Sequence, residues 1–144
     1  MSEIQPSQET LKEILSYFNQ DNFLKAEELA NTLIKEYSNN IFLLKILGVI
    51  HAKQGNFNKA REYNKRVITV NPKDSEGYNN LGICYKNLNF IEESIASFKQ
   101  AIRLNSSYAD AYYNLSNVYE MQGNDDDSFA ANLQAVKYNT RNIK

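Results

Sequence analysis

The sequence of 144 residues has little of what several protein classes require, since it contains one cysteine, one histidine, two prolines and no tryptophan. A single cysteine excludes an internal disulfide and a zinc cluster built from cysteines. Sixteen basic residues against seventeen acidic ones give a net charge of -1. This balance excludes a broad basic field for nucleic acid or for an anionic membrane.

Long apolar segments are also absent. The longest one, residues 41–50, is interrupted by Lys45 and is much shorter than the roughly 20 residues of a membrane helix. The start of the chain is polar, unlike a secretory signal. We therefore expect a cytoplasmic protein that neither binds nucleic acid nor inserts into a membrane.

What the sequence does contain is a repeat with a period of 34 residues. When the sequence is compared with itself at this offset, one pattern recurs: a leucine, a small residue and, three positions later, a residue with a ring side chain. Its copies are Leu47-Gly48 and His51, Leu81-Gly82 and Tyr85, and Leu115-Ser116 and Tyr119. A weaker first copy completes four repeats, at residues 7–40, 41–74, 75–108 and 109–142. They predict a single domain over residues 1–144.

Each repeat has the pattern of two helices. Apolar residues recur at intervals of three and four, which is the helical period. A short polar turn lies between the two helices, and Gly55 and Gly123 occupy this turn in the second and fourth repeats. Asn40 and Asp74 stand where a helix N-cap is expected, and Pro72 favours the end of the preceding helix. Each repeat is therefore predicted to form a helical hairpin.

The third repeat carries a recognisable motif, Tyr78-x2-Leu81-Gly82-x2-Tyr85, followed by Ser94-x3-Phe98 and Ala101. This motif resembles the tetratricopeptide repeat, and the resemblance extends over nearly the whole chain. It implies an all-α fold, a right-handed α-solenoid of four tetratricopeptide hairpins. Small residues at the eighth and twentieth positions of a repeat let its helices approach closely.

The two ends of the chain depart from the motif. Thr10 and Glu13 occupy positions that are apolar in the other repeats, which is typical of a terminal repeat with a solvated outer face. Asn132 and Gln134 make the last helix fairly polar. Three interpretations of this end stay open: the helix caps itself, the chain is the front part of a longer protein, or the last hairpin stacks on another copy.

Candidate catalytic or metal-binding groups are few. His51 and Cys84 align with packing positions of the other repeats, so we expect both to be buried and unreactive. Residues 125–127 are three aspartates that open the last helix, where acidic side chains complement the helix dipole. No phosphate-binding loop or catalytic triad is apparent. We expect no enzyme, no bound metal and no cofactor.

The resemblance implies a concave groove lined by the first helix of each hairpin. Its best candidates for peptide binding are Lys45, Ile46, Val49, Asn79, Asn80, Ile83, Tyr113, Asn114 and Asn117. The same helices place Lys86, Asn87, Glu120 and Met121 farther along the groove.

Asn80 and Asn114 occupy the same position one repeat apart. This pair is similar to the asparagine ladder in the superhelix of the O-linked N-acetylglucosamine transferase, where side-chain amides hold a peptide backbone. A carboxamide offers one acceptor and two donors, so it can bind a peptide unit without reading its side chain.

We therefore expect a non-enzymatic interaction module or adaptor that binds an extended protein segment in the groove. Two alternatives stay open. The chain can be the N-terminal targeting region of a larger enzyme, such as a glycosyltransferase or a sulfotransferase. It can also be a scaffold that associates with itself, end to end, through its C-terminal hairpin.

Overall fold

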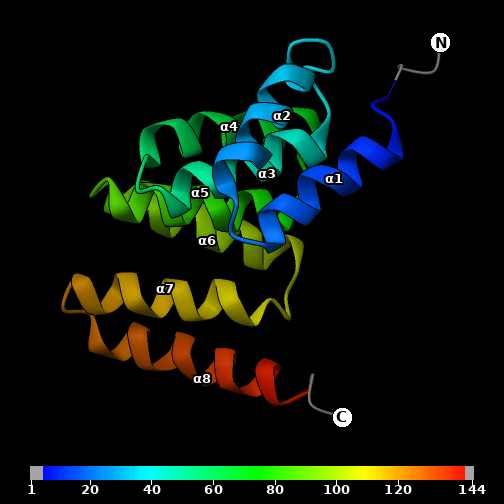
Figure 1. Ribbon diagram of the computed structural model, residues 1–144. Coiled ribbons are helices and arrows are strands. Elements are labelled where there is room, and N and C mark those ends of the chain that lie inside the picture. The colour runs from blue at the N-terminus through cyan, green and yellow to red at the C-terminus, as the bar shows by residue number, and fades with distance from the viewer. Residues whose placement is uncertain (1–4, 142–144) are drawn as a thin grey trace. The chain divides into compact units, whose positions relative to one another are not determined.

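The computed structural model describes residues 5–141, and this part of the chain contains eight α-helices and no strand (Figure 1). The helices follow one another as four hairpins: α1 (Gln8–Asn19) with α2 (Phe23–Ile34), α3 (Ile41–Lys53) with α4 (Phe57–Val70), α5 (Ser75–Asn87) with α6 (Ile91–Leu104), and α7 (Ala109–Met121) with α8 (Asp125–Arg141). The all-α class and the four helical hairpins are thus confirmed.

The chain divides into two compact units, a first unit of Met1–Val70 and a second unit of Asn71–Lys144. Each unit contains two hairpins, and each has its own hydrophobic core. In the first unit α2 packs on α3, and in the second unit α6 packs on α7. The core of the second unit is built around Phe98, Leu115 and Val118. That residues 1–144 form a single domain stays a prediction.

The turns inside the hairpins repeat with the same period as the sequence. The backbone takes a positive φ at Asp21, Gly55, Asn89 and Gly123, with values of 56°, 77°, 62° and 71°. These four residues are spaced 34 apart, and glycine, asparagine and aspartate are the residues that most readily take the left-handed conformation. The first and third hairpins therefore have the same turn conformation as the other two, although aspartate and asparagine replace glycine at this position.

The predicted caps are present where the second and third hairpins begin. Oδ1 of Asn40 accepts a hydrogen bond from the backbone N–H of Leu43 at 3.0 Å. Oδ1 of Asp74 accepts one from Gly77 at 2.7 Å. Helix α4 ends at Val70, two residues before Pro72, because proline cannot continue the backbone ladder. Asn40, Asp74 and Pro72 thus have the predicted roles.

The close approach of α5 and α6 depends on the absence of a side chain at Gly82. A Cβ atom there would lie 2.6 Å from Cε1 of Phe98, which is far inside van der Waals contact. Ser94 completes this contact, since its hydroxyl donates to the carbonyl oxygen of Gly82 at 2.8 Å. In the second hairpin Asn64 stands where the third hairpin has Phe98, and a Cβ on Gly48 would lie 3.3 Å from its Nδ2.

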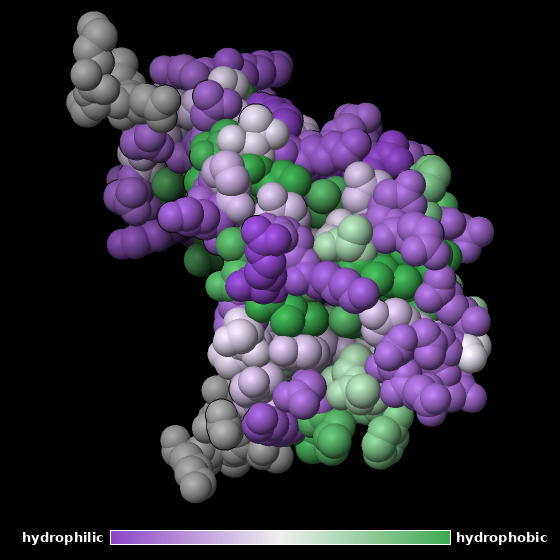
Figure 2. All heavy atoms as spheres, turned by 180° about the vertical axis from the view of Figure 1, so that it is seen from behind, coloured by the Kyte–Doolittle hydropathy of each residue, from purple (hydrophilic) through white to green (hydrophobic). Residues whose placement is uncertain are grey.

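The last helix, α8, carries large apolar side chains on its exposed side. Phe129, Leu133 and Val136 of α8 are 73%, 57% and 56% exposed. Apolar side chains gather at the lower edge of the second unit, where α8 lies (Figure 2). Asn132 is exposed as well, but it lies between apolar neighbours. These exposed apolar side chains disfavour the interpretation in which α8 caps itself, and the three interpretations of this end stay predictions.

Candidate functional site

The predicted binding residues of the second unit lie on two neighbouring helices, α5 and α7. Tyr113 is 55% exposed, and its neighbours on the two helices are half-buried: Asn80, Ile83, Asn114 and Asn117. They come together because α5 and α7 are the first helices of successive hairpins, so equivalent positions repeat side by side.

Asn79 is the exception among these residues. It is only 4% exposed, and its Oδ1 accepts a hydrogen bond from Nδ2 of Asn114 at 3.1 Å. Its burial argues for a structural role and against direct contact with a ligand. The bond also ties the Asn114 amide to α5, so Asn114 and Asn80 are not equivalent members of a ladder. The repeat period did not predict the pairing of Asn79 with Asn114, because the two residues are one repeat plus one residue apart.

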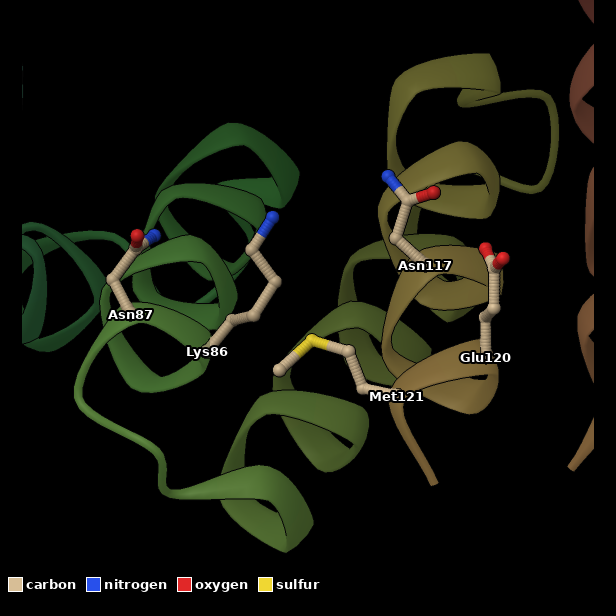
Figure 3. Close-up of a pocket in the computed structure, with 5 residues that line it drawn as sticks. All are labelled: Lys86, Asn87, Asn117, Glu120 and Met121. Atoms are coloured by element: carbon tan, nitrogen blue, oxygen red, sulfur yellow. The ribbon is translucent and has the colours of Figure 1, made fainter. Parts of the chain in front are cut away.

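A pocket of about 700 Å³ lies at the C-terminal ends of α5 and α7, and five residues line it. Lys86 and Asn87 project from α5, and Asn117, Glu120 and Met121 project from α7 (Figure 3). Nδ2 of Asn87 donates to the carbonyl oxygen of Ile83 at 2.9 Å, which fixes the orientation of its amide. The pocket therefore combines a cation, an anion, two amides and a flexible thioether.

Three predicted site residues lie on α3, in the first unit. Lys45 and Val49 are half-buried. Ile46 is 7% exposed and belongs to the hydrophobic core of that unit, so its side chain packs inside the protein. The candidate site of the second unit consists of α5 and α7 residues.

His51 and Cys84 are packing residues, as predicted. His51 is 3% exposed and stacks on the ring of Tyr63, with centroids 5.6 Å apart. Its Nε2 lies 3.7 Å from Oε1 of Glu27. Burial raises the pKa of the Tyr63 hydroxyl above its usual value. Cys84 is 1% exposed, which keeps its thiol away from solvent.

The three aspartates at 125–127 form the first turn of α8. Asp127 accepts a hydrogen bond from Nδ2 of Asn124 at 2.6 Å, which joins it to the turn before the helix. Within residues 5–141, no group of three or more His, Cys, Asp or Glu side chains is arranged to hold a metal ion. The position of the aspartates is the one expected for carboxylates that interact with a helix dipole.

Comparison with protein families decides the identity of these hairpins. A family model of the tetratricopeptide repeat matches residues 11–75, and a second TPR repeat model matches residues 85–123. The chain belongs to the tetratricopeptide repeat family. As a tetratricopeptide repeat chain it is a protein–protein interaction module, and the fold is typically non-catalytic. Over the residues that the structure describes, no helix is long and apolar enough to cross a membrane.

One relative of this tetratricopeptide repeat chain is the UDP-N-acetylglucosamine–peptide N-acetylglucosaminyltransferase of Caenorhabditis elegans. The two are 30% identical over 90 residues, which cover 60% of this chain and 8% of the transferase. Because the chain spans so little of that enzyme, the likeness concerns a short region and not the whole transferase.

Solved structures share the tetratricopeptide fold. The crystal structure of MamA matches with a TM-score of 0.81 and 26% identity, over 94% of this chain and 76% of MamA. YrrB, described as a TPR protein with an unusual peptide-binding site, matches with a TM-score of 0.79 and 21% identity, over 87% of this chain and 64% of YrrB. The likeness to YrrB shows the fold alone.

Proposed function

We propose that the face formed by α5 and α7 binds an extended segment of a partner protein. The observation that carries this proposal is the pocket of about 700 Å³ between the two helices, with its mixed lining of amide, charged and apolar groups. A side-chain pocket beside a row of amides suits a peptide, whose backbone and side chains need different partners.

The amides of this face supply the contacts to the peptide backbone. Asn114 and Asn87 each donate through Nδ2 to another group of the protein. Their Oδ1 atoms are therefore oriented acceptors for peptide N–H groups. Asn80 and Asn117 are half-buried on the same face, and each can both donate and accept. Bonds of this kind contribute about 0.5–1.5 kcal/mol each, so the affinity is modest and tolerates many sequences.

The charged and apolar side chains supply the selectivity. Lys86 and Glu120 line the same pocket from opposite helices, which favours a segment with an acidic residue near the first and a basic residue near the second. Met121 is 58% exposed, and methionine adapts to ligands of different shape. In the first unit, Lys45 and Val49 of α3 are half-buried and are proposed separately as partner contacts, whereas the buried Ile46 is not.

Photo-crosslinking in the source cells tests this function. A photoreactive phenylalanine analogue in place of Tyr113 is expected to capture one segment of a partner protein, identified by mass spectrometry. The same analogue in place of Leu24, which is 77% exposed on α2, serves as the matched control. Equal capture of the same segment from both positions would place the contact away from the α5 and α7 face and would refute the proposal.

A second candidate function follows from the transferase likeness. The relative from Caenorhabditis elegans is an enzyme acting on peptides, as its name states, and this chain matches 8% of it. If the chain is the targeting region of a larger enzyme, the gene must encode a catalytic domain in the same reading frame. A messenger RNA that ends its frame at Lys144 would contradict this alternative.

A further inference from the structure

The outer side of α8 carries three large exposed apolar side chains on one helix. Phe129, Leu133 and Val136 are all more than half exposed, and their spacing of four and three residues puts them on one side of the helix. The other side of α8 packs inward, since Ala131 and Ala135 are 7% and 6% exposed. These three large side chains are hydrated in the isolated chain, which costs free energy.

The repeat shows what kind of element fits such a face. Ile95 and Ile102 of α6 stand one repeat before Phe129 and Val136, and both pack in the core cluster that α7 completes. In α6 these two positions are therefore covered by α7, whereas Lys99, one repeat before Leu133, is exposed. The positions of Phe129 and Val136 are thus ones that a neighbouring helix covers in the preceding repeat.

Helix α1 of a second copy is a poor candidate for this position. Glu9 and Glu13 of α1 align with residues of α7 that pack in the core of the second unit, Ala111 and Leu115, but both glutamates are exposed. Burying these carboxylates against apolar side chains is costly, and the acidic first turn of α8 would repel them. The charges thus oppose a head-to-tail stack.

Helix α8 of a second copy fits in both charge and shape. Asp126 and Lys137 are exposed at opposite ends of the apolar face, on the same side of the helix by their spacing from Leu133. A parallel pair of α8 helices would place like charges together. An antiparallel pair that lays Leu133 of one copy over the small Ala130 of the other brings each Asp126 beside the partner's Lys137.

We propose that α8 pairs with α8 of a second copy in antiparallel orientation and forms a two-fold symmetric dimer. Such an isologous contact closes after two copies and does not continue into a filament. One helix per copy forms an interface at the small end of the usual range, so monomer and dimer exchange with concentration. This dimer is separate from peptide binding, because α5 and α7 take no part in the contact.

Sedimentation equilibrium of the whole chain from micromolar to millimolar concentration tests the proposal. The average mass is expected to rise from 16.6 kDa toward twice that value. Phe129→Ser with Leu133→Ser is expected to remain monomeric throughout. Leu24→Ser, which removes an apolar side chain that is 77% exposed on α2, is the matched control and is expected to associate as wild type does. Circular dichroism verifies that all variants are folded.

Charge exchange tests the antiparallel orientation. Asp126→Lys is expected to weaken association about tenfold, because it faces the partner's Lys137. Adding Lys137→Asp is expected to restore it. A wild type that stays monomeric, an association that survives the double serine variant, or a charge exchange that fails to restore it would each overturn the proposal. None of these outcomes bears on peptide affinity, which is measured separately.

Discussion

At the scale of single residues, the contact between Gly82 and Phe98 sets the distance between α5 and α6. We expect Gly82→Ala to be less stable than Gly48→Ala by about 1–3 kcal/mol, the usual cost of overpacking a core. Both substitutions gain the same helix propensity, so it cancels in the comparison. The free energies of unfolding come from urea denaturation.

Phe98→Leu is the control for this prediction, because a leucine removes the ring atoms that would lie 2.6–2.9 Å from a Cβ atom on residue 82. In the Phe98→Leu background the cost of Gly82→Ala is expected to shrink. Equal stability of Gly82→Ala and Gly48→Ala would show that the ring moves aside freely.

The hydrogen bond between Asn114 and Asn79 gives a second prediction at this scale. Asn114→Ala is expected to lower the free energy of unfolding by about 1–3 kcal/mol, because the buried Oδ1 of Asn79 loses its donor. Asn80→Ala removes a half-buried side chain from the same face and is expected to change stability by about 0.5 kcal/mol or less. Thermal and urea unfolding measure both. Equal losses in the two variants would mean that the bond contributes no stability.

At the scale of helices, side-chain caps mark where the first three hairpins begin. Asp74→Ala is expected to lower the free energy of unfolding by about 1 kcal/mol, because the N–H of Gly77 loses its acceptor at the start of α5. Asp74→Asn keeps an acceptor oxygen and is the matched control, with nearly wild-type stability. The prediction fails if asparagine is as harmful as alanine, as measured by urea denaturation.

The helices were more predictable from the sequence than the site. Period, turns and caps depend on residues that act locally, such as Gly55, Gly123 and Asp74, so their pattern is visible in a linear sequence. The bond between Asn79 and Asn114 and the burial of Ile46 depend on how helices pack on one another. The exposure of Phe129, Leu133 and Val136 was not predicted for the same reason. The sequence shows that these residues alternate with polar ones such as Asn132 and Gln134, but not which side of α8 is covered.

At the scale of the whole molecule, stability is divided between two cores. The first unit has a core that includes Ile14, Leu43 and Leu47, and the second has its own around Phe98 and Val118. Stability in repeat proteins is approximately a sum over repeats and their interfaces. The proposed peptide site on α5 and α7 lies within the second unit, so we expect it to depend on the stability of the two hairpins of α5 to α8.

The central claim is that the amides of α5 and α7 bind a peptide backbone. Its most direct test is the affinity of a synthetic peptide with the sequence captured at Tyr113, measured by fluorescence polarisation. Asn80→Ala with Asn117→Ala is expected to weaken binding about thirtyfold, which corresponds to about 2 kcal/mol for two amide contacts. These positions avoid Asn114, whose loss also affects stability.

Asn58→Ala, which removes an exposed asparagine from α4, is the matched control and is expected to bind as wild type does. Circular dichroism is expected to give the same helix content for all three proteins. An affinity of the double variant equal to that of wild type would contradict the account and move the binding site away from this face.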